Sequence, residues 1–249
     1  MTRIAVAVFV WVVIALYLLL IQPVLLLLVI VSPWLDPGRR MAGRVFRFSA
    51  RLAIYINPLW DFHVETRAHE LFHEPSVVVS NHESDADVFL STLLPWDLKY
   101  LSKETIYDLP VMGWGMRMAG DVRVVRGERV SGRQALEACR TWLDKGVSVI
   151  FFPEGTRSRK EEMLPFKEGA FRLAIEAQVP IQPFVVAGTR NALPPGSLVF
   201  NKTRAVARIL DPIPTAGLGL DDVTALTERV QNTIGAARTE LRRELGLEG

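Results

Sequence analysis

The sequence predicts an α/β fold: a mixed or largely parallel sheet flanked by helices, preceded by an N-terminal membrane-associated helical segment. Two observations predict the sheet. Strand-like apolar runs alternate with helix-like segments after residue 58, and two polar clusters each follow directly on such a run. The N-terminal segment is predicted by an apolar run, residues 4–31, that contains no charged residue. We therefore divide the chain into an anchor with a basic helix, residues 1–57, and one sizeable domain, residues 58–249.

The composition suits one folded domain and excludes few partners. The 249 residues are enough to bury a large core, and the net charge of +2 neither favours nor excludes an acidic partner. Basic and aromatic residues do not interleave, so nucleic acid is not predicted as a partner. The single cysteine, Cys139, excludes an internal disulfide and suits a reducing compartment. Its place on the apolar stripe of a predicted helix indicates a core residue.

The N-terminal apolar run is longer than the roughly 20 residues that a helix needs to cross a bilayer. A cleaved signal peptide is the competing interpretation, but its apolar core is usually only about 7–15 residues long, and no small-residue cleavage site follows here. Gln22 and Pro23 interrupt the run. Pro23 either kinks a single span or turns the chain, so that residues 4–21 and 24–31 form a hairpin dipping into one leaflet.

A basic amphipathic helix is predicted after the apolar run. Its arginines are four, three and four residues apart and therefore share one helical face: Arg40, Arg44, Arg47 and Arg51. Beside an apolar anchor, this pattern indicates contact with anionic lipid headgroups. The excess of arginine also predicts that the rest of the chain lies on the cytoplasmic side of an inner or cytoplasmic membrane. In the alternative, the helix is solvated and packs on its own domain.

The sheet is predicted from six apolar runs, which are residues 77–80, 98–101, 122–125, 147–152, 181–186 and 205–210. A helix follows the third run, with Ser131 and Gln134 as a capping box and Gly146 at its end. A last helix begins near Asp221 or Asp222 and carries apolar residues at three- and four-residue spacing. In sheets of this kind, sites gather in the loops at the carboxyl ends of the strands.

The first polar cluster, residues 81–87, lies between a strand-like run and an apolar helix-like segment. His82 is the side chain best suited to proton transfer near neutral pH. A carboxylate bonded to one ring nitrogen leaves the other nitrogen free to accept a proton, and then stabilises the imidazolium. Asp87 can do this only if His82 lies just before the helix and Asp87 in its first turn, because a five-residue offset on a straight helix separates the two faces. In the alternative, Ser84 and Asp87 form a helix cap and His82 merely packs.

The second polar cluster follows another strand-like run. Residues 153–159 read Pro-Glu-Gly-Thr-Arg-Ser-Arg, so that Glu154, Thr156 and Arg157 share one short loop. Gly155 permits an unusual backbone angle in this loop. Such a loop can hold a phosphate through paired hydrogen bonds, and the alternative is a surface turn with ordinary ion pairs. Arg126, at the end of a third strand-like run, is a further candidate.

Together these stretches resemble the glycerolipid acyltransferases related to 1-acyl-sn-glycerol-3-phosphate acyltransferase. Residues 81–87, with Asn81, His82, Ser84 and Asp87, match the His-x4-Asp signature of that family. The second, third and fourth blocks of the family resemble residues 103–126, 152–158 and 179–183. The blocks occur in the family's order, and the resemblance covers roughly residues 55–215.

The resemblance implies an activity and a role for each candidate residue. The family moves a fatty acyl group from an acyl thioester, carried by coenzyme A or acyl carrier protein, to a lysophospholipid hydroxyl. The implied acceptor is 1-acyl-sn-glycerol-3-phosphate and the implied product is phosphatidic acid, with His82 as general base and Asp87 as its orienting partner. The residues implied to bind the acceptor are Glu154, Gly155, Thr156 and Arg157, with Arg126 and Lys103 reaching its phosphate. No metal, cofactor or covalent acyl-enzyme is implied, and a Gly-x-Ser-x-Gly elbow is absent from the sequence.

Other interpretations stay open at this stage. Residues 69–73, His-Glu-Leu-Phe-His, match a zinc-protease motif, but the motif needs a helix and Pro75 leaves room for about one turn. A related enzyme acting on glycerol-3-phosphate, a lyso-aminolipid or a glycolipid is an alternative. A membrane lipid-binding module without turnover is another. The motifs do not predict acyl-chain length, donor, acceptor headgroup or oligomeric state.

Overall fold

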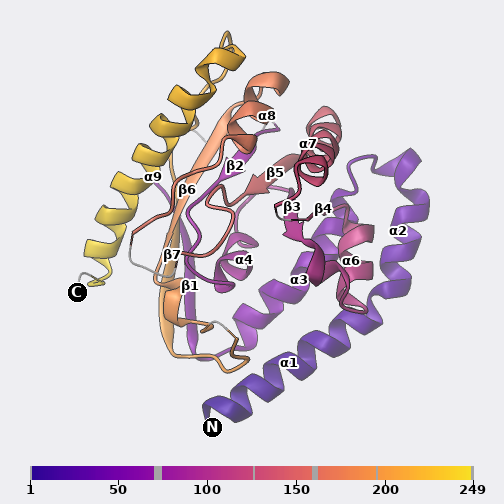
Figure 1. The fold of residues 1–249 in the computed structure, drawn as a ribbon. Coiled ribbons are helices and arrows are strands. Elements are labelled where there is room, and N and C mark those ends of the chain that lie inside the picture. Colours follow the sequence, from indigo (N-terminus) through magenta and orange to yellow (C-terminus); the bar gives the residue numbers. More distant parts are fainter. Residues whose placement is uncertain (1, 70–74, 126, 159–161, 195, 248–249) are drawn as a thin grey trace.

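In a computed structural model, the described residues form a seven-stranded sheet with helices on both faces (Figure 1). The structure describes residues 2–69, 75–125, 127–158, 162–194 and 196–247. The strands are β1 (Trp60–Thr66), β2 (Val77–Val79), β3 (Leu98–Lys103), β4 (Val122–Val124), β5 (Ser148–Phe151), β6 (Ile181–Ala187) and β7 (Thr203–Ile209). Their order is β1-β7-β6-β2-β5-β3-β4, and the pairings are parallel except for β6 with β7. The predicted fold class is confirmed.

The central strands are buried on both faces, as their continuous apolar sequences require. Val78 and Ile150 point into one hydrophobic core, whereas Val77 and Val149 point into the other. The first core includes side chains of α3 (Arg40–Ile56), α4 (Ala86–Ser91) and α6 (Met112–Ala119). The second core includes side chains of α7 (Arg129–Asp144), α8 (Gly169–Ala177) and α9 (Val223–Glu244). Short helices complete the connections: α5 (Glu104–Tyr107), η1 (Thr189–Asn191) and η2 (Leu220–Asp222).

Two details differ from the sequence predictions. β1 is missing from the predicted strands, although Trp60, Phe62 and Val64 alternate with polar residues as in a half-buried strand. The predicted capping box is wrong, because α7 begins at Arg129 and the Ser131 hydroxyl accepts a hydrogen bond from the Val125 N–H at 2.8 Å. Gly146 does follow the end of α7, with a positive φ of 73° that suits glycine.

The N-terminal apolar run forms two helices, α1 (Arg3–Leu20) and α2 (Gln22–Leu35), which meet at an angle near the edge of the molecule (Figure 1). Pro23 lies in the first turn of α2, where a missing N–H is tolerated. Val10 and Ile14 on one face of α1 are buried, and the Tyr17 hydroxyl donates to the Val45 carbonyl at 2.8 Å. By length and composition, α1 is apolar enough to cross a membrane.

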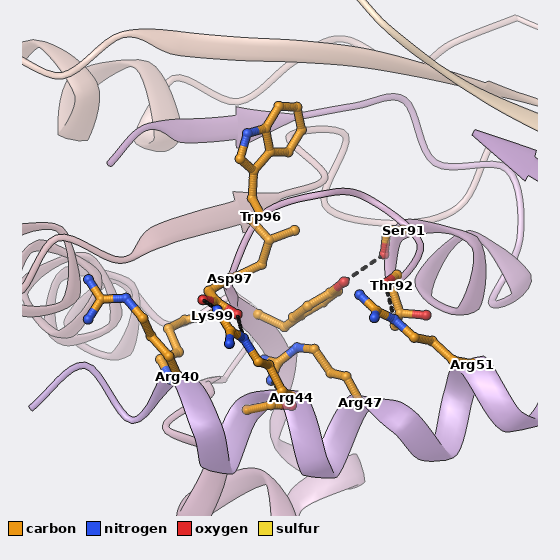
Figure 2. Close-up of a pocket in the computed structure, with 12 residues that line it drawn as sticks. Arg40, Arg44, Arg47, Arg51, Ser91, Thr92, Trp96, Asp97 and Lys99 are labelled. Carbon is orange, nitrogen blue, oxygen red and sulfur yellow. Dashed lines mark hydrogen bonds and ion pairs between the residues drawn. The ribbon is translucent and has the colours of Figure 1, made fainter. Parts of the chain in front are cut away.

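The basic face of α3 is turned towards the sheet domain, as Figure 2 shows. Arg44 donates to both carboxylate oxygens of Asp97, at 2.8 and 2.7 Å, and Arg51 Nε donates to the Thr92 carbonyl at 2.6 Å. The remaining arginines bind elsewhere in the domain, Arg47 to Asp121 and Arg40 to the Gly146 carbonyl. The structure therefore favours the alternative in which this helix packs on its own domain over the interpretation as a lipid-contacting face.

Candidate active site

The site is built where three neighbouring parallel strands end. β2 pairs in parallel with both β5 and β6, so the loops that follow these strands meet at one edge of the sheet. The loop after β2 carries His82, the loop after β5 carries Glu154, and η1 after β6 carries Thr189. Asn81 ties two of these strand ends together, because its side chain donates to and accepts from the backbone of Val186, both at 2.9 Å.

His82 and Asp87 form a hydrogen-bonded pair across a bend. Asp87 lies in the first turn of α4 and His82 precedes the helix, so His82 Nδ1 lies 2.7 Å from Asp87 Oδ2. The same oxygen accepts the backbone N–H groups of Glu83 and Ser84 at 2.7 and 2.9 Å, which is also the arrangement of a helix cap. Thr189 Oγ1 donates to the other oxygen, and Asp87 is completely buried. The carboxylate is thereby fixed in place. Only the acid's half of the predicted cap forms, because α4 has no side-chain cap hydrogen bond and the Ser84 hydroxyl accepts from the Ala86 N–H at 3.2 Å instead. His82 is paired with Asp87 and does not merely pack.

The pairing with Asp87 engages one ring nitrogen of His82 and leaves the other, Nε2. A neutral histidine that donates from Nδ1 to a carboxylate keeps a lone pair on Nε2. Among the described residues, Nε2 of His82 has no hydrogen-bond partner, while its ring stacks on Phe152 with centroids 4.4 Å apart. His82 is 8% exposed, and it lines the cavity described below. This geometry suits a group that takes a proton from a bound ligand.

Glu154 holds the loop after β5 against the turn of residues 81–87. Its Oε1 accepts the His82 backbone N–H at 2.7 Å, and its Oε2 accepts the Leu164 backbone N–H at 2.8 Å. Burial raises the pKa of Glu154, and these two hydrogen bonds oppose that rise. Because both oxygens are used inside the chain, the contacts favour a positioning role for Glu154 over the predicted contact with the acceptor.

A cavity of about 490 Å³ lies beside His82. Its wall is mostly apolar and comes from β3, β4, β5, α4, α5, α7 and α8; typical members are Val88, Leu101, Ile106, Leu136, Ile150 and Phe152. Its polar and charged lining includes Asp85, Lys103, Glu128 and Lys167. A mainly apolar cavity with a few charged groups, lined by a histidine, can hold a ligand with an apolar chain and an anionic end.

The structure brings some of the predicted acceptor-binding residues to this cavity and leaves others outside it. Gly155 and Lys103 line it, and Gly155 has a positive φ of 71°. Arg157 is bonded through Nη1 to Asp85 Oδ2 at 2.5 Å, and Thr156 is exposed beside it. Arg126 lies outside the described residues, so its predicted role stays a prediction.

Comparison with known proteins agrees with this geometry. The family model for the acyltransferases, described as Acyltransferase, matches residues 62–187. The chain belongs to the acyltransferase family. It is 36% identical over 189 residues to 1-acyl-sn-glycerol-3-phosphate acyltransferase alpha of Ovis aries, a match that spans 74% of this chain and 65% of that protein. It is 42% identical over 123 residues to the chloroplastic 1-acyl-sn-glycerol-3-phosphate acyltransferase BAT2 of Brassica napus, a match that spans 49% of this chain and 36% of that protein.

The crystal structure of the 1-acyl-sn-glycerophosphate acyltransferase PlsC from Thermotoga maritima has the same fold as this chain. The two superpose with a TM-score of 0.78 over 96% of each chain, at 22% sequence identity. The likeness therefore extends to the N-terminal helices, which lie outside the part matched by the family model.

Several residues of the candidate site were not among the sequence predictions. Arg238 of α9 donates through Nε and Nη2 to Glu83 Oε1, at 2.8 and 2.6 Å, and Glu83 is the residue after His82. Thr189 binds Asp87, and Lys167 lies over Gly155 on the cavity wall. Lys167 could have been found from the sequence, because it lies in the same strand-to-helix connection as the second polar cluster. Thr189 and Arg238 have no sequence signal, since only the fold brings them to partners more than a hundred positions away.

The described part of the chain contains no group of three His, Cys, Asp or Glu side chains that could hold a metal ion. The zinc-protease motif lies mostly outside the described residues. Its first histidine, His69, is 90% exposed at the side chain and pairs with Asp211. Cys139 is 1% exposed in the second core, and burial raises the pKa of its thiol to about 12.

Proposed function

We propose that the chain is an O-acyltransferase that moves a fatty acyl group from an acyl thioester to the free hydroxyl of 1-acyl-sn-glycerol-3-phosphate, giving phosphatidic acid. The observation that carries this proposal is the buried His82–Asp87 pair, 2.7 Å apart, beside a mainly apolar cavity. The names of the relatives support the choice of acceptor. The sheep protein and the T. maritima protein are both named for acylation of this lysophospholipid.

In the proposed reaction, His82 acts as general base. Nε2 takes the proton of the acceptor hydroxyl as its oxygen attacks the thioester carbonyl carbon, and Asp87 stabilises the imidazolium that forms. The tetrahedral intermediate collapses by breaking the carbon–sulfur bond. The leaving thiolate, of coenzyme A or acyl carrier protein, takes the proton from His82. The ester and the free thiol are then the products, with no covalent acyl-enzyme, cofactor or metal.

The charged residues around the cavity support an anionic acceptor. Lys103 and Lys167 line the cavity, and Arg157 lies next to its wall through Asp85. Guanidinium and ammonium groups bind phosphate through charge-assisted hydrogen bonds. We assign the acceptor phosphate to this end of the site and the acyl chains to the apolar wall.

We further propose that α1 and α2 bind the membrane that supplies the acceptor. Leu20 and Leu27 are 72% and 60% exposed, and most of the other outward positions on these helices are apolar too. Because the opposite face of α1 packs on the domain, we infer that α1 lies in one leaflet, with the domain on the cytoplasmic side.

Vesicle flotation tests membrane binding with the double variant Leu20→Glu and Leu27→Glu. The double variant should lose most of its vesicle binding, whereas Leu220→Glu, at a leucine 49% exposed elsewhere, should not. Equal flotation of all three proteins would contradict membrane binding by these helices.

The function is tested with detergent-solubilised protein, acyl-CoA or acyl carrier protein as donor, and a panel of acceptors, with products identified by mass. We expect phosphatidic acid from lysophosphatidic acid and no ester from monoacylglycerol, which has no phosphate. Transfer to a lyso-aminolipid, a glycolipid or glycerol-3-phosphate in preference would replace the proposed acceptor. Binding of lysolipids without turnover on any donor would favour the lipid-binding module.

A further inference from the structure

Asp85 forms an ion pair with Arg157, the residue whose guanidinium is proposed to bind the acceptor phosphate. Asp85 is the residue before α4, yet its side chain makes no capping hydrogen bond to the helix. Its carboxylate instead accepts from Arg157 Nη1 at 2.5 Å. The pair therefore links the His-x4-Asp turn to the loop after β5.

The cavity lies on the Asp85 side of this pair. Asp85 lines the cavity together with His82 and Gly155, whereas Arg157 is not among the described residues of its wall. The carboxylate is consequently part of the cavity wall, and the guanidinium that it binds is not. Lys103 and Lys167 line the same cavity without a carboxylate partner in the part of the chain that the structure describes. Arg129 lines the cavity as well, and no ion pair of it is seen among the described residues, whereas Arg157 is already neutralised by Asp85.

The pair is also exposed enough to open at small cost. The Asp85 side chain is 57% exposed and that of Arg157 is 35% exposed. Ion pairs between exposed side chains are weak because water screens them, while a phosphate can bind a guanidinium with two parallel hydrogen bonds. A phosphate at this end of the cavity can therefore take the place of the carboxylate, whereas a hydroxyl cannot.

We propose that Asp85 is a specificity-determining residue, an internal carboxylate that competes with the acceptor phosphate for Arg157. This inference rests on the proposed function. The competition lowers the affinity for phosphorylated acceptors, and it keeps Arg157 neutralised when the cavity holds an acceptor without a phosphate.

The test compares Asp85→Asn with the unsubstituted protein in two measurements, steady-state kinetics with lysophosphatidic acid and calorimetric binding of glycerol 3-phosphate. Asparagine keeps the shape and removes the charge. We expect the KM and the dissociation constant of glycerol 3-phosphate to fall roughly two- to five-fold, the range that a partly exposed ion pair supports, with kcat within two-fold. In an Arg157→Ala background, the effect of Asp85→Asn on both values should be clearly smaller, because only the direct repulsion between the carboxylate and the phosphate remains.

Glu128→Gln is the matched control, because it removes a carboxylate from the same cavity wall without touching Arg157. An equal effect of Glu128→Gln, or an undiminished effect in the Arg157→Ala background, would mean general electrostatics and overturn the proposal. A KM and dissociation constant that rise or stay unchanged would overturn it as well, because Asp85 would then orient Arg157 or play no part. Failure of the proposed function is seen separately, as absent acylation of lysophosphatidic acid by the unsubstituted protein, and the glycerol 3-phosphate measurement still decides the role of Asp85.

Discussion

Replacing Arg238 by methionine should destabilise the fold, because the buried carboxylate of Glu83 loses its ion-pair partner. Arg238 on α9 donates two hydrogen bonds to Glu83, the neighbour of His82, and the two side chains are 10% and 2% exposed. The second oxygen of Glu83, Oε2, is buried without a partner among the described residues. Arg238 is therefore the main group that compensates this charge, and methionine fills a similar volume without doing so.

The magnitude follows from the burial of the pair. Removing one partner of a buried ion pair costs about 3–5 kcal/mol. Arg190 also lowers the pKa of Glu83 through its charge, so one positive group remains nearby and we expect the lower end, about 3 kcal/mol. For a chain of this size, that corresponds to a fall in Tm of roughly 6–12 °C.

The pH dependence has a definite sign. Burial raises the pKa of Glu83 above its ordinary value, and Arg238 opposes that rise. Without Arg238 the folded-state pKa of Glu83 rises further. In the variant, the charged carboxylate at high pH therefore destabilises the fold more, whereas the protonated form at low pH does not. The difference in Tm between Arg238→Met and the unsubstituted protein should consequently be larger at pH 8 than at pH 5.

Thermal unfolding in detergent, followed by circular dichroism, measures these differences. Arg140→Met is the control, because Arg140 and Asp144 form an ion pair whose side chains are 43% and 60% exposed. Loss of this exposed pair should shift Tm by no more than about 3 °C. Arg238→Met combined with Glu83→Gln should recover much of the loss. A fall in Tm no larger than that of Arg140→Met, at either pH, would refute the argument.

Three further predictions concern the site and its support. Asp87→Asn should lower kcat by up to about 10⁴-fold with an unchanged circular dichroism spectrum, as the same substitution does in a Ser-His-Asp triad; a loss below ten-fold would contradict the orienting role. Gly155→Ala should raise the acceptor KM several-fold, because its φ of +71° disfavours alanine and the new Cβ would lie 2.7 Å from Lys167 Nζ. Gly196→Ala has the same backbone strain, with a φ of +75°, but nothing near its Cβ, and an equal rise in KM there would reject the explanation. Burial lowers the pKa of Lys99 from 10.5 to about 7, with Arg47 adding to the effect, so the unfolded chain takes up the proton first and stability is lost as the pH falls from 10.5 to about 7. As the pH is lowered from 9 to 6, the Tm of the unsubstituted protein should therefore fall relative to the Tm of Lys99→Met. A difference between the two Tm values that stays constant over this range would contradict the explanation.

The parts that sequence reasoning could reach are those with local signals. His82 and Asp87 are close in sequence, and the strand-turn-helix pattern around them already implied the bend that joins them. The sheet was predictable because its buried strands are continuous apolar runs separated by helices, whereas β7, antiparallel to β6, has the same apolar pattern as a parallel strand. Strand direction within the sheet leaves no mark in such a pattern.

The remaining features depend on which segments meet in space. A face of arginines every three or four residues is equally suited to lipid headgroups and to the carboxylates and carbonyls of a protein surface, so the pattern of α3 did not show that Arg44 binds Asp97. Glu154 has backbone partners, which have no sequence signature. Arg238 lies 155 residues from Glu83, and a charged residue on a solvated helix has the same appearance as one that enters a core.

The most direct test of the account is the rate of phosphatidic acid formation by His82→Ala, with lysophosphatidic acid and an acyl thioester as substrates. Positioned general bases contribute about 10²–10⁴-fold to a rate, and we predict a loss in that range while the circular dichroism spectrum and Tm stay close to those of the unsubstituted protein. Turnover by His82→Ala at the rate of the unsubstituted protein would contradict the assignment of His82 as the base.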